Sequence, residues 1–322
     1  MILIIGSSAD PHVVSVAKEL TRIGHHFRIF DCFDGDSLGV DTSGPESLQI
    51  VLGKNAIDTS CVSSVWWRQK PRLIVPSHSV SAYYDYAFTA KEWIHLYEYL
   101  DYLLDGSYEI NPRKNAVRAS NKLWQLQRAS AVGFATPRTL VTNNPAAAQS
   151  FGESLNGNRF IYKTLTPYIN PTGQVTYTTI VDRDTISDFT KGVAATPCMF
   201  QEFIEKEREL RITVVGDNMF PVSIDSNNSL DTSIDWRQTI FDDIYSAWKI
   251  DDVFRAKVLS LHRELGLVYG AYDFIIDKRG DIVFLEVNPA GQWMWLENRL
   301  GLPIGAAIAQ ELIRGSIESA AS

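Results

Sequence analysis

Two β-rich runs, AYDFIID at 271–277 and DIVFLEV at 281–287, are separated by only three residues. Runs rich in β-branched and aromatic residues that flank a short glycine-containing segment predict an antiparallel hairpin. A turn at Arg279-Gly280 places residues 278 and 281 opposite each other, so the numbers of paired residues sum to 559. This hairpin constrains the fold most strongly, because its register decides which side chains share a face of the sheet.

The predicted register places Asp273 directly opposite Glu286, with their Cβ atoms about 5 Å apart, and Asn288 follows on the same face. Two opposed carboxylates repel each other, and a bound divalent cation removes that cost. Magnesium prefers such carboxylate and amide oxygens. We therefore predict a magnesium site at Asp273, Glu286 and Asn288. The alternative is a solvated hairpin with ordinary surface acids, and it requires no shared face for Asp273 and Glu286.

The first 110 residues have the pattern of an open parallel sheet. A strand, a helix and a second strand follow one another at 1–5, 11–23 and 26–30, which predicts a βαβ unit. The first turn reads GSSADP and lacks the second and third glycines of a dinucleotide-binding turn, so we exclude that function. We predict a further strand at 62–67, a helix at 82–104 and a domain boundary at Asn111-Pro112.

The remaining residues predict two further lobes, so the whole is an α/β and α+β fold. We divide the chain into residues 1–110, 111–198 and 199–322. The central part carries a helix at 114–131, strands at 138–142, 160–165 and 175–181, and a short helix at 184–191. The last part carries a strand at 199–204, a hairpin at 210–215 and 219–224, a helix at 250–265, the carboxylate hairpin and a final amphipathic helix with Ile304, Ile308 and Leu312 on one face.

Charge and composition exclude several classes of function. The formal net charge is −8, which argues against nucleic acid or an anionic membrane surface as a partner. No apolar stretch reaches about 18 residues and no signal peptide is recognisable, so we expect a cytoplasmic protein. The three cysteines, Cys32, Cys61 and Cys198, are widely spaced, which argues against a disulfide framework or a structural zinc site.

Two lysines and one charged segment are candidates for nucleotide contacts. Lys122 lies in a predicted helix, and Lys163 ends an apolar strand where an anionic phosphate would relieve its burial. In MFQEFIEKERELRITVVG, at 199–216, an apolar strand breaks into charges and resumes as a second strand. Such a break offers backbone groups to adenine, with Glu205 or Glu209 for ribose and Arg211 for phosphate oxygens. The alternatives are solvated lysines and an exposed charged loop.

These motifs, together with YDFI at 272–275 and LEVNPAG at 285–291, resemble the ATP-grasp superfamily in order and spacing. The resemblance implies ATP and Mg²⁺ as cofactors, and a Rossmann-like pre-ATP-grasp domain in the first 110 residues. The usual glycine-rich lid is reduced to YINPTGQVTY at 168–177. The implied contacts are Lys122 and Lys163 with the ATP phosphates, Gln201, Glu202, Phe203 and Ile204 with adenine, Glu209 with ribose, Arg211 near the γ-phosphate, and Asp273, Glu286 and Asn288 with one or two magnesium ions.

A narrower resemblance involves WWRQKPR at 66–72, the block from Ile110 to Pro145, YTTIV at 177–181 and DWRQ at 235–238. These segments look like the maturases of graspetides, the microviridin-type macrocyclases. The resemblance implies a homodimer that activates Asp or Glu side chains of a precursor peptide, with leader and core segments, as acyl phosphates. A Ser or Thr hydroxyl or a Lys amine of the peptide then closes an ω-ester or ω-amide ring.

Three further side chains are candidates for the peptide site. Asp235 and Arg237 suit a peptide carboxylate, with Arg237 making a bidentate contact, and the alternative is a surface ion pair. Arg68 is either structural or substrate-facing. We also expect a lid around residues 167–173 to exclude water from the acyl phosphate. Two other functions stay open, namely an amino-acid or peptide-terminus ligase and a nucleotide-binding regulator without turnover.

Overall fold

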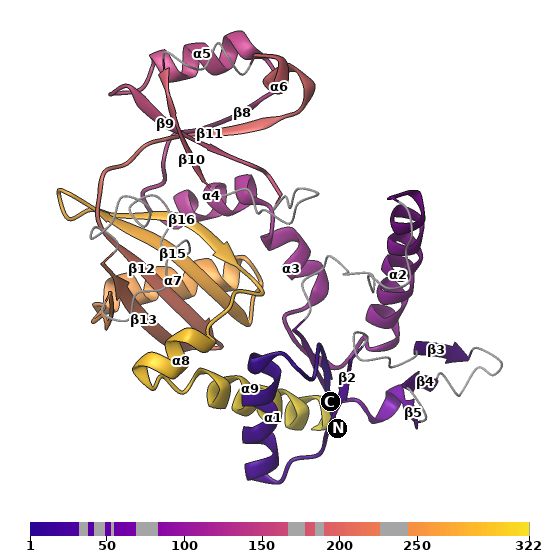
Figure 1. Ribbon diagram of the computed structural model, residues 1–322. Coiled ribbons are helices and arrows are strands. Elements are labelled where there is room, and N and C mark those ends of the chain that lie inside the picture. The colour runs from indigo at the N-terminus through magenta and orange to yellow at the C-terminus, as the bar shows by residue number, and fades with distance from the viewer. Residues whose placement is uncertain are drawn as a thin grey trace.

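The computed structural model describes residues 1–31, 38–41, 49–52, 55–68, 83–166, 178–183, 190–225 and 244–321. Figure 1 shows a mixed α/β molecule with a small lobe at the top, a larger antiparallel sheet below it and a parallel sheet beside both chain termini. The predicted lid at 167–173, the peptide-site residues Asp235 and Arg237, and most of the predicted helix at 184–191 lie outside the described residues.

The N-terminal sheet is parallel, and its strand order is β2-β1-β6-β7. The predicted βαβ unit is confirmed, because α1 (Pro11–Ile23) connects the parallel strands β1 (Ile2–Ile5) and β2 (Phe27–Phe30). Asp10 caps α1, since its side chain accepts a hydrogen bond from the backbone N–H of His12. The sheet continues with β6 (Ser64–Trp67) and β7 (Tyr108–Ile110). The Rossmann-like assignment of this region stays a prediction.

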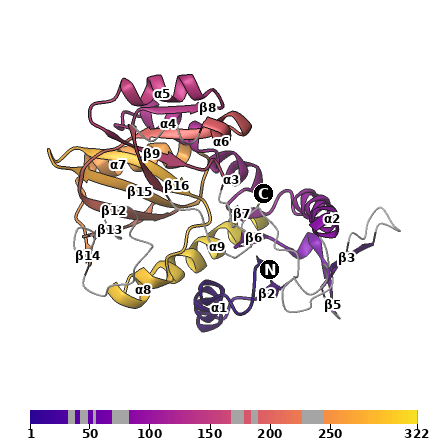
Figure 2. The ribbon, with the colours of Figure 1, turned by 45° about the horizontal axis from the view of Figure 1, so that its top comes forward.

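Helices cover both faces of this sheet. Ile2 and Ile4 face α1 and the last helix, α9 (Ile304–Ala321), while Leu3 and Ile5 face α2 (Tyr83–Leu103). The alternation follows from the period of two in a strand, which sends neighbouring side chains to opposite faces. The predicted face of Ile304, Ile308 and Leu312 is confirmed, and Figure 2 shows α9 running back to the N-terminal sheet.

An antiparallel sheet of β3 (Leu38–Asp41), β4 (Gln49–Leu52) and β5 (Asn55–Asp58) was not predicted. These four-residue strands lie in a segment, 32–60, that is rich in Gly, Asp and Ser, a composition typical of loops, so no strand pattern stands out. A 3-10 helix, η1 (Thr59–Cys61), follows these strands and leads into β6. None of the described helices is long and apolar enough to cross a membrane.

The small lobe is an antiparallel sheet of order β10-β9-β11-β8. Its strands are β8 (Thr139–Thr142), β9 (Arg159–Lys163), β10 (Thr179–Asp182) and β11 (Cys198–Glu202), and its helices are α5 (Pro145–Glu153) and α6 (Thr190–Ala195). The single helix predicted at 114–131 is wrong. The chain forms α3 (Arg113–Ala119) and α4 (Lys122–Ala131), because the Asn121 side chain accepts a hydrogen bond from the Trp124 N–H and starts a new helix.

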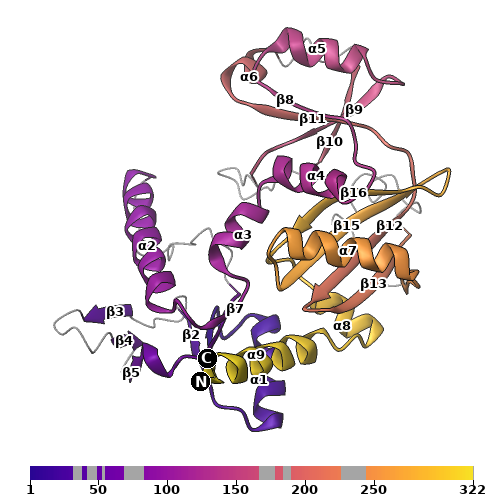
Figure 3. The same cartoon turned by 180° about the vertical axis from the view of Figure 1, so that it is seen from behind.

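The large sheet has the order β14-β13-β12-β15-β16 and is antiparallel throughout. Its strands are β12 (Lys206–Val215), β13 (Asn218–Ile224), β14 (Tyr245–Ala247), β15 (Tyr269–Asp277) and β16 (Ile282–Asn288). Helix α7 (Asp252–Glu264) covers one face, as Figure 3 shows from behind, and α8 (Met294–Leu300) follows β16. The side chains that face α7, such as Ile212 and Phe274, are buried against it. Arg211 and Asp273, their neighbours in sequence, therefore lie on the opposite face of the sheet.

A buried histidine under this sheet predicts a pH dependence of stability. His262 of α7 is 3% exposed, its Nδ1 lies 2.8 Å from the Tyr272 hydroxyl, and burial lowers its pKa to about 4. The unfolded chain binds this proton below about pH 6.5 whereas the folded chain does not. Stability is therefore lost as the pH falls from about 6.5 to about 4, by about 3 kcal/mol from this group.

Urea unfolding at pH 7, 6, 5 and 4 measures this effect, with His262→Gln as the control. We expect the loss of stability with falling pH to be smaller in the variant by about 3 kcal/mol. Glu109 acts in the opposite direction, because burial raises its pKa to about 7, and its contribution is the same in both proteins. Equal pH dependence of the two proteins would contradict the assignment to His262.

Candidate active site

The carboxylate hairpin has the predicted pair but not the predicted turn. Next to the turn the pairing is shifted by one residue from the prediction. Ile276 pairs with Ile282 and Phe274 with Phe284, so the paired numbers sum to 558 and not to 559. The register then shifts between Phe274 and Asp273, so Leu285 forms a β-bulge and Asp273 pairs with Glu286 as expected. The prediction of residues 278 and 281 as a pair is wrong, whereas the predicted pairing of the two acids is confirmed.

The turn differs because its side chains favour a longer connection. Asp277 accepts hydrogen bonds from the backbone N–H groups of Arg279 and Asp281, both at 2.9 Å, and Gly280 has a φ of +87°. Asp277 N also donates to the Asp281 carbonyl. A turn of this length without the bulge would pair Asp273 with Leu285 and put Glu286 on the α7 face. The bulge therefore brings the second carboxylate to the site.

Three charged residues form a row across three neighbouring strands on this face. Arg211 of β12 lies opposite Asp273 of β15, which lies opposite Glu286 of β16. Arg211 Nη1 donates to both carboxylate oxygens of Asp273, at 2.8 and 2.9 Å. The Asp273 and Glu286 side chains are 14% and 21% exposed, so a ligand can reach them. The row therefore places one positive charge beside two neighbouring negative charges, and Arg211 offsets part of the repulsion between the two carboxylates.

The two predicted lysines approach the same row from the small lobe and its neighbouring helix. Lys122, the first residue of α4, has its Nζ 3.5 Å from Glu286 Oε2 and donates to the Thr164 carbonyl at 3.3 Å. Lys163 is the last residue of β9 and immediately precedes Thr164. The end of β9 and the start of α4 thus meet beside Glu286, which brings Lys122 to this carboxylate and the backbone next to Lys163 close to Lys122.

Gln125 is a site residue that the sequence analysis missed. It is 2% exposed, its Oε1 accepts from the Val287 N–H at 3.0 Å, and its Nε2 donates to the Val287 carbonyl at 2.8 Å. This amide pairs with the edge of β16 as a neighbouring strand would, and it fixes α4 beside the strand that carries Glu286 and Asn288. The signal in the sequence is a glutamine on the buried face of the helix, next to Leu126 and Ala129.

The predicted adenine segment joins the small lobe to the large sheet. β11 ends at Glu202 and β12 begins at Lys206, so residues 203–205 connect two different sheets. Gln201 is 2% exposed and donates to Thr139 Oγ1 at 3.0 Å. Glu202 accepts weakly from the Arg138 N–H at 3.4 Å, and the Phe203 ring lies under the Arg159 guanidinium. Ile204, next in the connection, is half-buried.

The structure separates the two glutamates that the sequence offered for ribose. Glu209 is 8% exposed and lies 2.5 Å from Lys206 Nζ, on the same strand as Arg211. Glu205 has a 55% exposed side chain that pairs with Lys278 at 2.6 Å, and this hydrogen bond lowers its pKa. Of the two glutamates, Glu209 is therefore the better candidate for the ribose contact, because it lies on the strand that carries Arg211.

The donor set suits a hard divalent cation. The described residues contain no group of three or more His, Cys, Asp or Glu side chains arranged to hold a metal, so the predicted site needs Asn288 as its third oxygen donor. Asn288 lies opposite Ala271, on the same face as Asp273 and Glu286, and its Oδ1 accepts from the Ala290 N–H at 3.0 Å. Two carboxylates and an amide fit magnesium, which completes its shell with water and phosphate oxygens.

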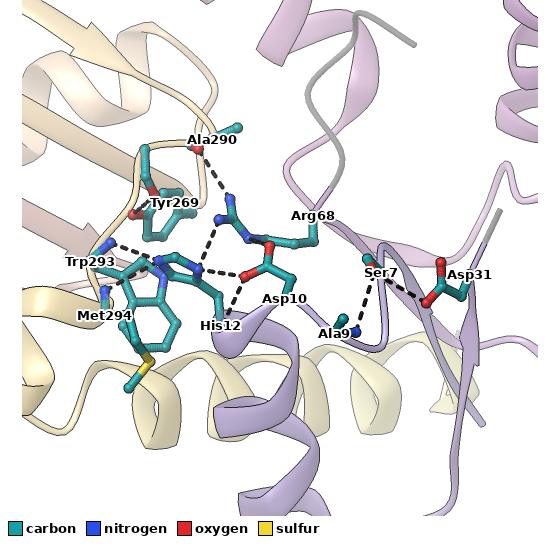
Figure 4. Close-up of polar contacts among 11 residues, drawn as sticks. Ser7, Ala9, Asp10, His12, Asp31, Arg68, Tyr269, Ala290, Trp293 and Met294 are labelled. Carbon is teal, nitrogen blue, oxygen red and sulfur yellow. Dashed lines mark hydrogen bonds and ion pairs between the residues drawn. The ribbon is translucent and has the colours of Figure 1, made fainter. Parts of the chain in front are cut away.

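Arg68 lies outside this row, in the buried cluster shown in Figure 4. Its side chain is 8% exposed, its Nε lies 2.9 Å from Asp10 Oδ2, and its Nη1 donates to the Ala290 carbonyl at 3.2 Å. The contact with Asp10 is ionic, because Nε is not aligned for a hydrogen bond. Burial by itself would raise the pKa of Asp10, but the His12 hydrogen bond and the Arg68 charge outweigh it and lower that pKa to about 2. Of the two alternatives for Arg68, this position favours the structural one.

Comparisons with solved structures agree with the geometry. A ligase from Chryseobacterium gregarium, described as a RiPP-associated ATP-grasp ligase in complex with ADP and a leader and core peptide, is 26% identical, with a TM-score of 0.85 over 97% of this chain and 96% of that one. The macrocyclase MdnC of Microcystis aeruginosa MRC, bound with precursor peptide MdnA, is 27% identical, with a TM-score of 0.84 over 98% and 100% of the two chains.

A second macrocyclase of the same organism, MdnB, is also 27% identical, with a TM-score of 0.80 over 97% of this chain and 98% of that one. No protein-family model and no curated protein sequence matches the chain. The similarity to the three solved structures extends over 97 to 98% of this chain.

Proposed function

We propose that this chain, an ATP-grasp ligase by its fold and its likeness to solved RiPP ligases, closes macrocycles in a ribosomal precursor peptide. One observation carries the proposal: the likeness to two macrocyclases and a peptide-bound ligase covers 97% or more of this chain. The charged row of Arg211, Asp273 and Glu286 supports ATP-dependent carboxylate activation at the site that the sequence indicated.

The described residues suit the two ligands of this reaction. Asp273, Glu286 and Asn288 would hold Mg²⁺, which neutralises charge on the phosphate oxygens of ATP. Lys122, Lys163 and Arg211 would neutralise the remaining phosphate charge, and in phosphoryl transfer such positioning and neutralisation provide most of the catalysis. The remaining roles follow the same proposal, with adenine at Gln201, Glu202, Phe203 and Ile204 and ribose at Glu209.

The chemistry balances in two steps. A side-chain carboxylate of the peptide attacks the γ-phosphorus of ATP, ADP leaves, and the carboxylate becomes an acyl phosphate. A Ser or Thr hydroxyl or a Lys amine of the same peptide then attacks the acyl carbon, loses its proton and expels phosphate. The ring is an ω-ester or an ω-amide according to the nucleophile. Asp235 and Arg237 would position the carboxylate, and residues 167–173 would exclude water.

The proposal includes three points about the setting. The partner is a precursor peptide with a leader for recognition and a core for the reaction, and the Chryseobacterium gregarium ligase is itself in complex with a leader and core peptide. A homodimer is expected from the family resemblance. A cytoplasmic location fits the need for ATP and for a newly made peptide.

Co-expression with a short peptide encoded beside this chain tests the proposal. The peptide should carry Thr or Ser and Asp or Glu residues in its C-terminal half, and each ring should lower its mass by one water. A gain of an amino-acid mass would replace the proposal with an amino-acid ligase. An unchanged mass, together with no peptide-dependent ADP release, would favour a regulator without turnover. Glu286→Gln is the matched control for reactions that do not depend on the site.

A further inference from the structure

The N-terminal sheet contains a crevice of the kind that binds ligands in open α/β proteins. From the central strand β1 the chain passes through α1 to β2 on one side, whereas β6 pairs with the other side of β1. In such sheets ligands bind outside the carboxyl ends of the strands, where the order reverses. Here that position lies between the turn after β1 and Arg68, the residue after β6.

The crevice is filled by a segment of this same chain. Residues 289–294, here called the support loop, follow Asn288 directly and enter the crevice from the large sheet (Figure 4). The described residues leave only a cavity of about 10 Å³ between Arg68, Asn111 and the loop. That volume corresponds to about one water molecule, so a nucleotide or peptide cannot share the crevice with the loop.

Side chains from four separate segments hold the backbone of the support loop. Four consecutive carbonyls each accept a hydrogen bond: Pro289 from Asn111 (2.9 Å), Ala290 from Arg68 (3.2 Å), Gly291 from Tyr269 (2.7 Å) and Gln292 from Arg211 (3.2 Å). A Cβ atom on Gly291 would lie 2.5 Å from the Ala271 Cβ and 3.0 Å from Arg211 Nη2. The loop is therefore pressed against the row that carries Asp273.

His12 completes the hold from the N-terminal domain. Its Nε2 accepts from the backbone N–H groups of Trp293 and Met294, at 3.1 and 3.2 Å, and its Nδ1 lies 2.6 Å from Asp10 Oδ1. Because Nε2 accepts twice, we place the ring proton on Nδ1, where Asp10 Oδ1 accepts it. Arg68 Nη2 lies 3.0 Å from the same Nδ1 and so contacts the ring without donating to it. His12 is 5% exposed and has its ring edge against Trp293, so no substrate reaches it.

We propose that Asp10, His12 and Arg68 are positioning residues that act through the support loop on Asn288 and Arg211. The N-terminal domain then uses its ligand crevice to fix the metal end of the active site. Both targets are directly attached to the loop: Asn288 precedes it and caps the Ala290 N–H, and Arg211 donates to the Gln292 carbonyl. The inference rests on the proposed function for the identity of the ligands, Mg²⁺ and adenine nucleotide.

Mn²⁺ binding to the full-length protein tests this role. The binding is measured by electron paramagnetic resonance in the presence of saturating ADP. No peptide is added, so a failure of macrocyclisation leaves this test intact. We expect His12→Ala and Arg68→Ala to weaken Mn²⁺ binding by about 10-fold or more, the effect typical of residues that orient metal ligands. His12→Gln should bind within about twofold of wild type, because its amide oxygen can accept where Nε2 accepts.

Two further variants separate positioning from general loss of structure. The Asn side chain of His12→Asn reaches Asp10 but not the support loop, so this variant should bind Mn²⁺ as weakly as His12→Ala. If His12→Ala fails to fold, the comparison of His12→Asn with His12→Gln decides the question. Asp31→Asn lies at the same end of the sheet, where Asp31 accepts from Ser7 and Ser8 of its own domain. It should lower the melting temperature without changing Mn²⁺ affinity. Equal affinity of His12→Asn and His12→Gln, or no Mn²⁺ binding by the wild type, would overturn the proposal.

Discussion

Replacement of Asp273 by Asn is expected to lower peptide-dependent ADP formation by about 10²- to 10³-fold, the usual effect of removing one preorganised charge from a transition state. Asp273 lies between Arg211 and Glu286 in the charged row and accepts both hydrogen bonds of Arg211 Nη1. The neutral amide loses the charge that would hold Mg²⁺ and leaves Arg211 without its counter-ion. Glu286→Gln should have an effect of similar size, and the double variant should be close to either single one, because the two residues act as a unit.

A matched control exists on the same strand. Asp277→Asn removes a carboxylate from the end of β15, where Asp277 accepts from the turn N–H groups of Arg279 and Asp281. This change should lower stability by about 1 kcal/mol and leave the rate per folded molecule within about threefold. Coupled-enzyme detection of ADP with a fixed peptide concentration provides the rates. Turnover by Asp273→Asn at the wild-type rate would remove the row from the active site.

Replacement of Phe274 by Ala is expected to lower the free energy of unfolding by about 3 to 5 kcal/mol. Phe274 is fully buried, and its ring centroid lies 5.3 Å from those of Phe134 and Phe254 and 5.6 Å from that of Phe284. The variant loses the burial of the ring and leaves a cavity between the large sheet and α7. Because Phe274 is adjacent to the bulge at Leu285, a reduced rate should accompany the reduced stability.

Urea denaturation followed by tryptophan fluorescence measures this loss at fixed pH. Phe88→Ala is the matched control, since Phe88 of α2 is 65% exposed and the same truncation should change stability by no more than about 0.5 kcal/mol. A loss below about 1 kcal/mol for Phe274→Ala would show that the ring cluster does not hold α7 to the sheet.

Local patterns explain which predictions succeeded. The helices α1 and α7 have clear caps and apolar faces, and the structure contains both of them, and also α2, within a few residues of the predicted ends. The break between α3 and α4 was missed although Asn121 is a good N-cap, because the apolar periodicity continues across it. The strands β3 to β5 were missed because the Gly, Asp and Ser residues around them are typical of loops.

The pairing of Asp273 with Glu286 was predicted correctly through two errors that cancel. The assumed two-residue turn is absent, which shifts the pairing by one residue. The bulge at Leu285, which was not predicted, shifts it back, so that the predicted pairing holds at Asp273. A bulge has no reliable local signature, since it depends on how the strand is held from outside. Here the Phe284 N–H donates to the Ala135 carbonyl and the Gln125 amide pairs with Val287, and both partners lie more than a hundred residues away.

The sequence by itself determined the chemical set of two opposed acids, an amide, two lysines and an arginine. The resemblance of these motifs to the ATP-grasp superfamily implies ATP-dependent carboxylate activation. Side-chain chemistry and the period of two in a strand are local properties, so they can be read without coordinates. Only the tertiary structure decided that Arg211 neutralises Asp273, that Gln125 fixes β16, and that Asp10, His12 and Arg68 hold the support loop. These contacts join segments up to 282 residues apart, and their formation depends on how whole sheets and helices pack.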